Sequence, residues 1–392
     1  MKSEWNHFAL GEITELVIDY RGKTPKKLGG DWCKQGYRAL SAKNIKTGRI
    51  VQAETIRYID ESLYRKWMKD EVQRGDILIT SEAPFGQIFF WDSDEKIVLS
   101  QRLFCVRIKP EYDARFIYYY MTTPEFQSEL DGRATGTTVI GLRQPELMKC
   151  VIRCPEIQEQ KVIAAILSSI DAKIIANEKV NDNLQQQAAA LFSSLYDRTN
   201  TEVRFTDLIQ ILGGGTPKTD ENTYWNGNIA FFTPKDVGTP YTLITEKTIT
   251  EEGLSHCNSR LYPVNTVFVT ARGTVGKVGM SGVPMAMNQS CYALVGKETH
   301  QLLVYFYTLK AVDRLKHKAS GAVFDAITTR DFESEQIMKL SDDDAKSFLC
   351  IAEPMFQKVL NNSIENQRLS TLRDSLLPKL MSGEIDVSSV HL

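Results

Sequence analysis

The sequence has few residues of the kinds that hold metal ions or disulfides, and it has no long apolar run. Its five histidines and seven cysteines are scattered, and no second cysteine pair accompanies Cys150 and Cys154. A zinc site or a disulfide framework is therefore not expected, and reduced thiols are the default. No apolar run approaches the roughly 20 residues of a membrane helix, and the N-terminal residues lack the apolar core of a signal peptide. These absences predict a cytoplasmic protein with no bound metal.

An excess of one charge is also missing. The 47 Lys and Arg residues nearly balance 49 Asp and Glu residues, which argues against a protein that coats nucleic acid without regard to sequence. The hydrophobic content of 42% is ordinary for folded proteins. A chain of 392 residues is too long for one typical core, so we expect two or more domains.

The most informative feature present is an internal repeat. The offset between matched segments starts at 192 residues and falls smoothly to 185, as expected when surface loops gain or lose residues. The matches, in chain order, pair residues 21–26 with 213–218, 39–45 with 231–237, 76–80 with 266–270, 100–101 with 288–289, and 135–136 with 320–321. Five matches in one order indicate a duplication.

Each repeat has the pattern of a mostly β domain with many loops. Short β-branched and aromatic runs, such as residues 76–80, 87–91 and 103–108, are punctuated by Gly, Pro, Asp and Lys. Residues 114–121 and 303–310 are expected to form short helices packed on it. The glycines at 213–215 suit tight turns and lack the spacing of a phosphate-binding loop.

Each repeat ends in a long helical pattern with a coiled-coil seam. Alternating steps of four and three residues give one seam per repeat. The first seam contains Ile163, Leu167, Ile170, Ile174, Asn177, Asn181, Leu184, Ala188, Leu191 and Leu195, and the second contains Phe348, Ala352, Met355, Val359, Asn362, Asn366, Leu369, Arg373, Leu376 and Leu380. Arg373 is the one charged residue among these seam positions. Pro354 should kink the second helix or delay its start.

The asparagines predict how the helices pair. They occupy the same layers of both seams, and antiparallel pairing would bring Asn177 beside Asn366 and Asn181 beside Asn362. Matched amides in an apolar seam fix register at a cost in stability. The predicted fold is α+β, with two β-rich domains related by pseudo-two-fold symmetry and separated by two long antiparallel coiled-coil helices. The expected parts are residues 1–154 and 199–341 for the domains, 155–198 and 342–385 for the helices, and 386–392 for a tail.

A basic run points to DNA. Residues 21–49 hold nine Lys and Arg residues against Asp31 alone, a candidate phosphate-contacting surface, although a solvated charged face is an equal alternative. The second repeat has fewer basic residues at the equivalent positions, and the basic segment 310–318 adds to them. Base contacts must come from loops that differ between the repeats. The candidate DNA-binding residues are Arg21, Lys23, Lys26, Lys27, Lys43, Asn44, Arg102, Lys218, Lys235, Asp236, Arg272 and Lys277.

Along essentially its whole length, the chain resembles the specificity subunit of type I restriction-modification systems. The resemblance rests on the Gly-x-Thr-Pro segments ending at Pro25 and Pro217, on residues 271–279, on residues 154–160 opening the first helix, and on residues 372–385 closing the second. It implies two target-recognition domains that each read one half of a bipartite, asymmetric double-stranded DNA site. It also implies helices that bind two methyltransferase (modification) subunits and, in the full complex, restriction/translocase subunits.

The resemblance implies no cofactor on this chain, with S-adenosylmethionine and ATP on the partner subunits. The second helix departs from the pattern, because residues 340–345 lack the Pro-x-x-x-x-Gln entry of the first. This puts equal docking of partners at the two ends in doubt.

Enzyme functions fit the sequence poorly. No Pro-Pro occurs, which excludes the Asn/Asp-Pro-Pro-aromatic segment of an adenine methyltransferase. A metal nuclease is harder to exclude, but Asp76 is replaced by Thr266 in the second repeat and no set of carboxylates with a lysine is evident. We expect a non-catalytic subunit. The competing interpretation is an adaptor whose two β domains bind proteins and whose helices space them.

Overall fold

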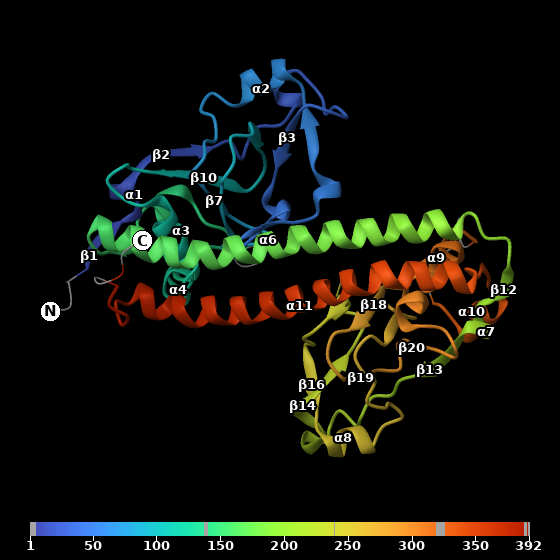
Figure 1. Ribbon diagram of the computed structural model, residues 1–392. Helices are drawn as coiled ribbons and strands as arrows, with labels where there is room; N and C mark the ends of the chain where they lie inside the picture. The colour runs from blue at the N-terminus through green and yellow to red at the C-terminus, as the bar shows by residue number, and fades with distance from the viewer. Residues whose placement is uncertain (1–4, 137–139, 239, 319–325, 388–389, 391–392) are drawn as a thin grey trace. The chain divides into compact units, whose positions relative to one another are not determined.

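The chain forms two compact units. The computed structural model describes residues 5–136, 140–238, 240–318, 326–387 and 390. One unit comprises Met1–Ala172 and Leu369–Leu392, and the other comprises Lys173–Arg368; we call them unit 1 and unit 2. Each contains one β-rich domain and one segment of each long helix, α6 (Ile157–Tyr196) and α11 (Asp342–Met381) (Figure 1). The predicted α+β class with two β-rich domains and two long helices is confirmed.

The domain of unit 1 is built on a four-stranded antiparallel sheet with the order β2-β10-β7-β8. A second sheet, β6-β3-β9, packs on it through a shared apolar cluster that includes Leu40, Leu78 and Leu99. The main strands are β2 (Thr14–Asp19), β7 (Ile77–Thr80), β8 (Ile88–Phe90) and β10 (Leu103–Ile108). The others are β1 (Asn6–Ala9), β3 (Tyr37–Leu40), β4 (Ile45–Lys46), β5 (Arg49–Ile50), β6 (Arg57–Ile59), β9 (Ile97–Leu99) and β11 (Val151–Cys154).

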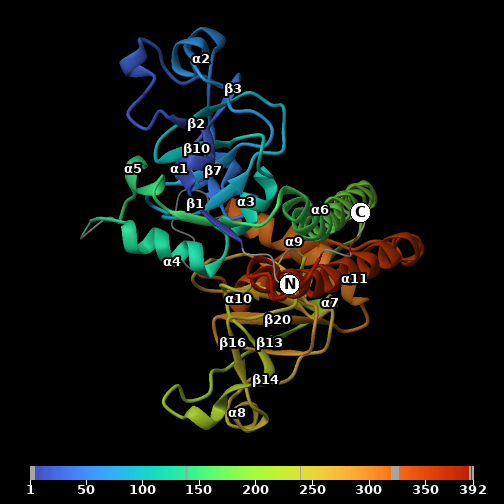
Figure 2. The same ribbon diagram turned by 90° about the vertical axis from the view of Figure 1, so that its left-hand side faces the viewer.

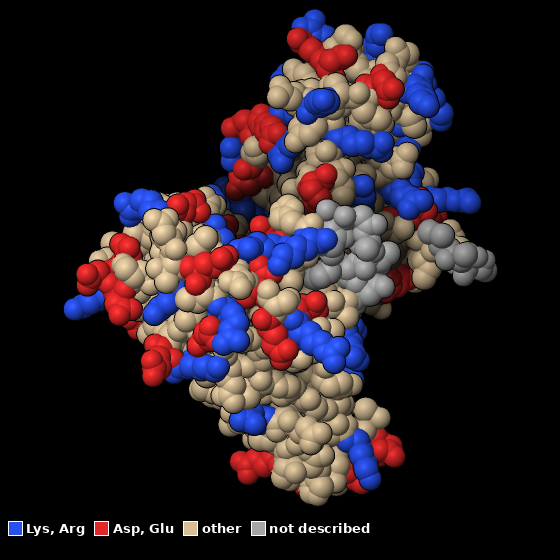
Figure 3. Space-filling model, turned by 90° about the vertical axis from the view of Figure 1, so that its right-hand side faces the viewer, with Lys and Arg blue, Asp and Glu red and all other residues tan. Residues whose placement is uncertain are grey.

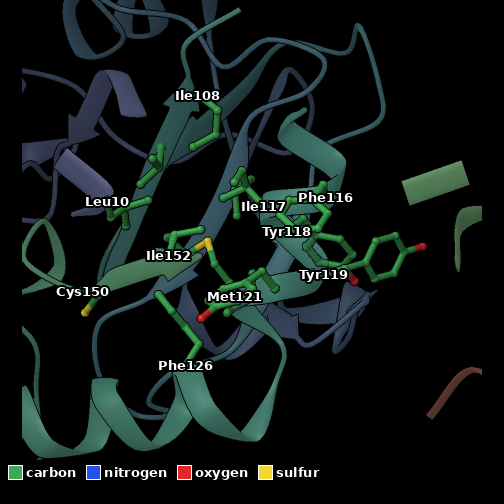
Figure 4. Packing of buried hydrophobic residues seen from close by; sticks show 14 of the residues in the cluster. Leu10, Ile108, Phe116, Ile117, Tyr118, Tyr119, Met121, Phe126, Cys150 and Ile152 are labelled. Atoms are coloured by element: carbon green, nitrogen blue, oxygen red, sulfur yellow. The ribbon is translucent and has the colours of Figure 1, made fainter. Parts of the chain in front are cut away.

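Helix α3 (Ala114–Met121) joins this domain to the long helices. Its first turn is capped by Asp113, whose carboxylate accepts a hydrogen bond from the Phe116 N–H at 2.8 Å. From Phe116 onward every side chain of the helix is buried, in a core shared with the sheet and with α6 residues such as Ile163 and Leu167 (Figure 4). The remaining helices are α1 (Leu10–Ile13), α2 (Glu61–Trp67), α4 (Pro124–Arg133) and α5 (Gln144–Leu147). The long helix therefore completes the hydrophobic core of this domain.

Unit 2 repeats the plan, with one additional strand in its main sheet. Its main sheet has the order β13-β20-β17-β18-β15, and its second sheet has the order β16-β14-β19. The strands are β12 (Glu202–Arg204), β13 (Ile209–Gly213), β14 (Trp225–Phe232), β15 (Tyr241–Thr242), β16 (Lys247–Ile249), β17 (Val267–Thr270), β18 (Val278–Ser281), β19 (Met285–Met287), β20 (Cys291–Gly296) and β21 (Gln336–Met338). The helices are α7 (Phe205–Leu208), α8 (Glu251–Ser255), α9 (Gln301–Lys318) and α10 (Thr329–Ser334). The helix expected at 303–310 is therefore more than a turn longer than predicted.

The duplication extends to strand register. Arg38 of β3 pairs in parallel with Ile97 of β9, and Ala230 of β14 pairs in parallel with Met285 of β19. Within each unit the layers follow the same order from the long helices to the main sheet, the second sheet and a short helix, α2 or α8 (Figure 2). Close approach explains Gly214, because a Cβ there would lie 2.3 Å from the Asn288 carbonyl oxygen.

In unit 2, α6 and α11 run antiparallel and meet through the four asparagines. The Asn177 side-chain amide donates to Asn366 Oδ1 at 2.8 Å, and that of Asn362 donates to Asn181 Oδ1 at 2.8 Å. Asn177 also donates to Glu365 at 2.8 Å. The structure thus brings together the two pairs that the antiparallel arrangement predicts.

In unit 1, Arg373 has a specific partner on the facing helix. Its guanidinium donates to Asp171 Oδ1 at 2.7 Å, and the Tyr119 hydroxyl of α3 donates to the other oxygen of Asp171 at 2.6 Å. Burial and the nearby Asp171 raise the pKa of Tyr119, so its hydroxyl stays protonated. The expected delay at Pro354 is wrong, since α11 begins at Asp342 and continues through it. Its packed seam outweighs the roughly 3 kcal/mol that an interior proline costs.

Candidate nucleic-acid interface

In unit 1, the loops at one end of the two sheets are fastened to one another. The Ser81 N–H donates to the Arg102 carbonyl at 2.9 Å, and the Leu142 N–H donates to the Ser81 carbonyl at 3.0 Å. The Ala42 N–H donates to the Gln101 carbonyl at 3.1 Å, which ties in the loop after β3. We call this surface loop edge 1; it comprises residues 20–27, 41–46, 81–87, 100–102 and 140–142.

Unit 2 has the same arrangement at the equivalent positions. The Ala271 N–H donates to the Ser290 carbonyl at 2.8 Å, and the Ile327 N–H donates to the Ala271 carbonyl at 2.9 Å. The Thr274 hydroxyl donates to the Pro234 carbonyl at 3.1 Å. We call this surface loop edge 2; it comprises residues 214–218, 233–238, 271–277, 288–290 and 326–327, with residue 239 outside the described residues. The two edges share the backbone hydrogen bonds at Ser81 and Ala271 and differ in side chains.

Three of the predicted basic residues of loop edge 1 are engaged within the fold. Arg21 forms a bidentate ion pair with Asp19, donates to the Leu142 carbonyl at 3.3 Å and lies over the Phe104 ring. Lys23 donates to the Trp67 carbonyl at 2.5 Å, and Lys27 donates to the Gly22 carbonyl at 2.9 Å. The basic run is therefore not a uniformly free patch, and Arg21 has contacts within the fold besides its predicted role in DNA binding.

The electrostatics of Lys23 agree with this. Burial lowers the pKa of its ammonium, and the positive charge of Lys69 lowers it further, against a smaller opposite effect of Asp70. The ammonium also lies 3.8 Å from the centre of the Tyr20 ring. The ammonium of Lys23 is therefore in contact with a carbonyl group and an aromatic ring of its own unit.

Asn44 and Asp236, both predicted as DNA-binding residues, form hydrogen bonds within the fold. Asn44 is 1% exposed, and its Oδ1 accepts from the Ser41 N–H at 3.1 Å while its amide donates to Thr55 at 3.1 Å. Asp236 Oδ2 accepts from the Thr233 N–H at 2.8 Å in the same way. Each side chain closes a tight turn after its strand, a common use of Asn and Asp.

The exposed cations of the two edges are distributed differently. Lys26 and Lys43 are exposed on edge 1, and no partner of either ammonium is found among the described residues. The same holds on edge 2 for Lys218, Arg272 and Lys277, whereas Lys235 lies 3.5 Å from Glu246. In the segment 310–318, Lys310 lies over the Tyr196 ring, and Lys318 pairs with the buried Glu335. The face drawn in Figure 3 shows basic side chains intermingled with acidic ones.

Loop edge 1 contains an ion pair that the sequence analysis did not predict. Arg102 Nε lies 3.0 Å from Glu82 Oε1, and both side chains are partly exposed. The repeat contained the signal, because the equivalent positions in unit 2 are Arg272 for Glu82 and Ser290 for Arg102. The two edges thus present opposite charges at one equivalent position.

Two features that would indicate other functions, a metal-binding cluster and a membrane-spanning helix, were sought in the described part of the chain. No group of three or more His, Cys, Asp or Glu residues is placed to hold a metal ion among the described residues. Within the same residues, no helix is both long and apolar enough to cross a membrane.

Comparison with known families agrees with this interpretation. The family model described as type I restriction modification DNA specificity domain matches residues 2–186 and 198–339, once for each repeat. The chain is similar to the type I restriction enzyme MjaIX specificity subunit of Methanocaldococcus jannaschii, with 22% identity covering 81% of this chain and 79% of that one. It is also similar to the HindI specificity subunit of Haemophilus influenzae, with 22% identity covering 81% of this chain and 88% of that one.

A solved structure shares the fold. The crystal structure of the type I restriction-modification system S subunit from M. genitalium has a TM-score of 0.62 and 16% identity, covering 96% of both chains. At this identity the likeness concerns the arrangement of the backbone alone.

Proposed function

Since the chain belongs to the type I restriction-modification DNA specificity domain family, we propose that loop edges 1 and 2 each read one half of a bipartite, asymmetric site in double-stranded DNA. The observation that carries this proposal is the repeated loop edge. The same hydrogen bonds hold Ser81 and Ala271 at the base of both edges, while the exposed side chains around them differ. Shared backbone hydrogen bonds with different exposed side chains suit two readers of different sequences.

Catalysis belongs, in this proposal, to other subunits. The long helices would dock two methyltransferase subunits, which bind S-adenosylmethionine, and the full complex would add restriction/translocase subunits that use ATP. This chain would then supply the target, and the partners would supply the chemistry. Both long helices also carry exposed apolar side chains, such as Ile175, Ile351 and Leu372.

The proposal is tested by filter binding with a pool of random duplexes, with and without a methyltransferase partner. Neutralising Lys26, Lys43 and Lys46 together to Gln should weaken binding to all sequences, because these exposed ammonium groups would contact phosphates. Each lost contact should reduce the slope of log affinity against log salt by about 0.9.

The control is Lys66→Gln, which changes an exposed lysine of α2 outside both loop edges. It should leave affinity and slope unchanged. DNA retention that is absent or insensitive to salt, with and without the partner, would instead favour a protein-binding adaptor.

A further inference from the structure

Positions 82 and 102 of unit 1 correspond to positions 272 and 290 of unit 2, and the two pairs carry different side chains. In unit 1 they hold Glu82 and Arg102, joined as an ion pair at 3.0 Å. In unit 2 they hold Arg272, for whose guanidinium no partner is found among the described residues, and the short Ser290. These positions therefore differ between the repeats in the way that two unlike readers require.

Arg102 is held in an unfavourable backbone conformation. Its φ is 65°, in the left-handed region that a long side chain rarely adopts. The carbonyl of Arg102 accepts the Ser81 N–H at 2.9 Å, and the neighbouring Gln101 carbonyl accepts the Ala42 N–H at 3.1 Å. These hydrogen bonds fix the backbone of Arg102 between the loops that follow β7 and β3. Such strain is found where function determines a side chain's position.

The ion pair itself does not explain why the arginine is present. The Arg102 side chain is 47% exposed and that of Glu82 is 35% exposed, and surface pairs of this kind contribute little stability. The strained backbone costs stability as well. A structural role would thus be better filled by glycine at this position, which adopts a positive φ without strain.

The geometry leaves the far side of the guanidinium available. Glu82 engages Nε, and no partner of Nη1 or Nη2 is found among the described residues. Two parallel N–H groups at this end match the O6 and N7 acceptors of guanine in the major groove. A phosphate contact fits less well, because the carboxylate 3.0 Å away neutralises the arginine and repels an anion.

Resting on the proposed function, we propose that Arg102 reads a guanine in the half-site of loop edge 1, with Glu82 as the positioning residue that orients its guanidinium. In loop edge 2, Arg272 occupies the position equivalent to Glu82, so the orienting carboxylate is missing. Ser290 occupies the position equivalent to Arg102. The two half-sites therefore differ at the base pair that these positions face.

The test uses the full chain with its methyltransferase partner and a pool of random-sequence duplexes, and it sequences the bound fraction. Wild type should select a two-part motif. Arg102→Lys keeps the charge but cannot donate two parallel hydrogen bonds, so the preference for guanine at one base pair of one half-site should fall by about 5- to 150-fold. Overall retention of the pool and its salt dependence should change little.

Three further variants separate reading from folding. Arg102→Gly should lose the same preference while its melting temperature stays equal or rises, because glycine relieves the strained φ. Glu82→Gln should weaken the preference in the same base pair, and Arg65→Lys on α2 is the matched control that should change nothing.

The outcomes are distinct. If Arg102→Lys and Arg102→Gly select the wild-type motif unchanged, Arg102 does not read a base and the inference is overturned. A uniform loss of affinity with an unchanged motif would assign Arg102 to the phosphates and also overturn it. Failure of wild type to select any motif would instead overturn the proposed function.

Discussion

At the scale of single residues, the structure separates polar side chains that serve the fold from those that face solvent. Asn44 and Lys43 are neighbours in a basic loop, yet the amide is 1% exposed and the ammonium lies in solvent. The sequence identifies both as polar loop residues. It does not show which of the two turns inward, because that depends on the carbonyls of residues 51 and 52, which fold back onto the turn.

Replacing Asn44 should therefore affect stability and leave DNA specificity intact. Asn44→Ala leaves the Ser41 N–H and the carbonyl groups around the amide without partners, so we expect the free energy of unfolding to fall by about 1–3 kcal/mol. Urea unfolding of the purified chain measures this. Lys43→Ala is the control, since an exposed change of this kind should stay within about 0.5 kcal/mol. A changed target motif in Asn44→Ala would contradict the structural role.

At the scale of elements, the long helices were predictable and the sheets were only partly so. A seam repeated every few residues along α6 and α11 is local information, and it identified the layers that the asparagines occupy. Asp171 escaped notice because it lies beside the seam, and only the antiparallel register places it opposite Arg373. The parallel pairing of β3 with β9 joins segments about 60 residues apart, and no local periodicity encodes such a contact.

The asparagine layer offers a test of the helix pairing within unit 2. Asn362→Leu removes the donor to Asn181 Oδ1 and should destabilise the chain by about 1–3 kcal/mol, because a buried acceptor loses its partner. Changing both Asn181 and Asn362 to Leu should restore much of this loss, since two apolar side chains need no hydrogen bond. The double-mutant cycle, measured by denaturant unfolding, should give a coupling of about 0.5–3 kcal/mol.

Asn361→Leu is the matched control for this cycle, because it lies one residue away and is exposed. It should change stability by less than about 0.5 kcal/mol. Additive effects of the two buried replacements would contradict the pairing of Asn181 with Asn362.

At the scale of the whole molecule, the first and last strands of each recognition domain pair with each other. In unit 1, β1 pairs antiparallel with β11, so that Asn6 lies opposite Cys154. In unit 2, β12 pairs antiparallel with β21, so that Glu202 lies opposite Met338. The chain therefore begins and ends each domain at one place, which is the arrangement that tolerates exchange of a domain. The duplicated sequence predicted two domains, whereas the closure of each by a strand pair is a long-range contact.

Exchanging one domain between these strands should change half of the DNA target. Residues 205–335 lie between β12 and β21, so another recognition domain inserted there leaves both strands and both long helices unchanged. Loop edge 2 would be replaced in full, while Glu82, Arg102 and the remainder of loop edge 1 would stay as they are. Mapping methylated adenines across a host genome that carries the exchanged gene and its methyltransferase should show one new half-site and one retained half-site. A target altered in both halves would mean that the domains do not read independently, because the side chains of loop edge 1 are the same in both proteins.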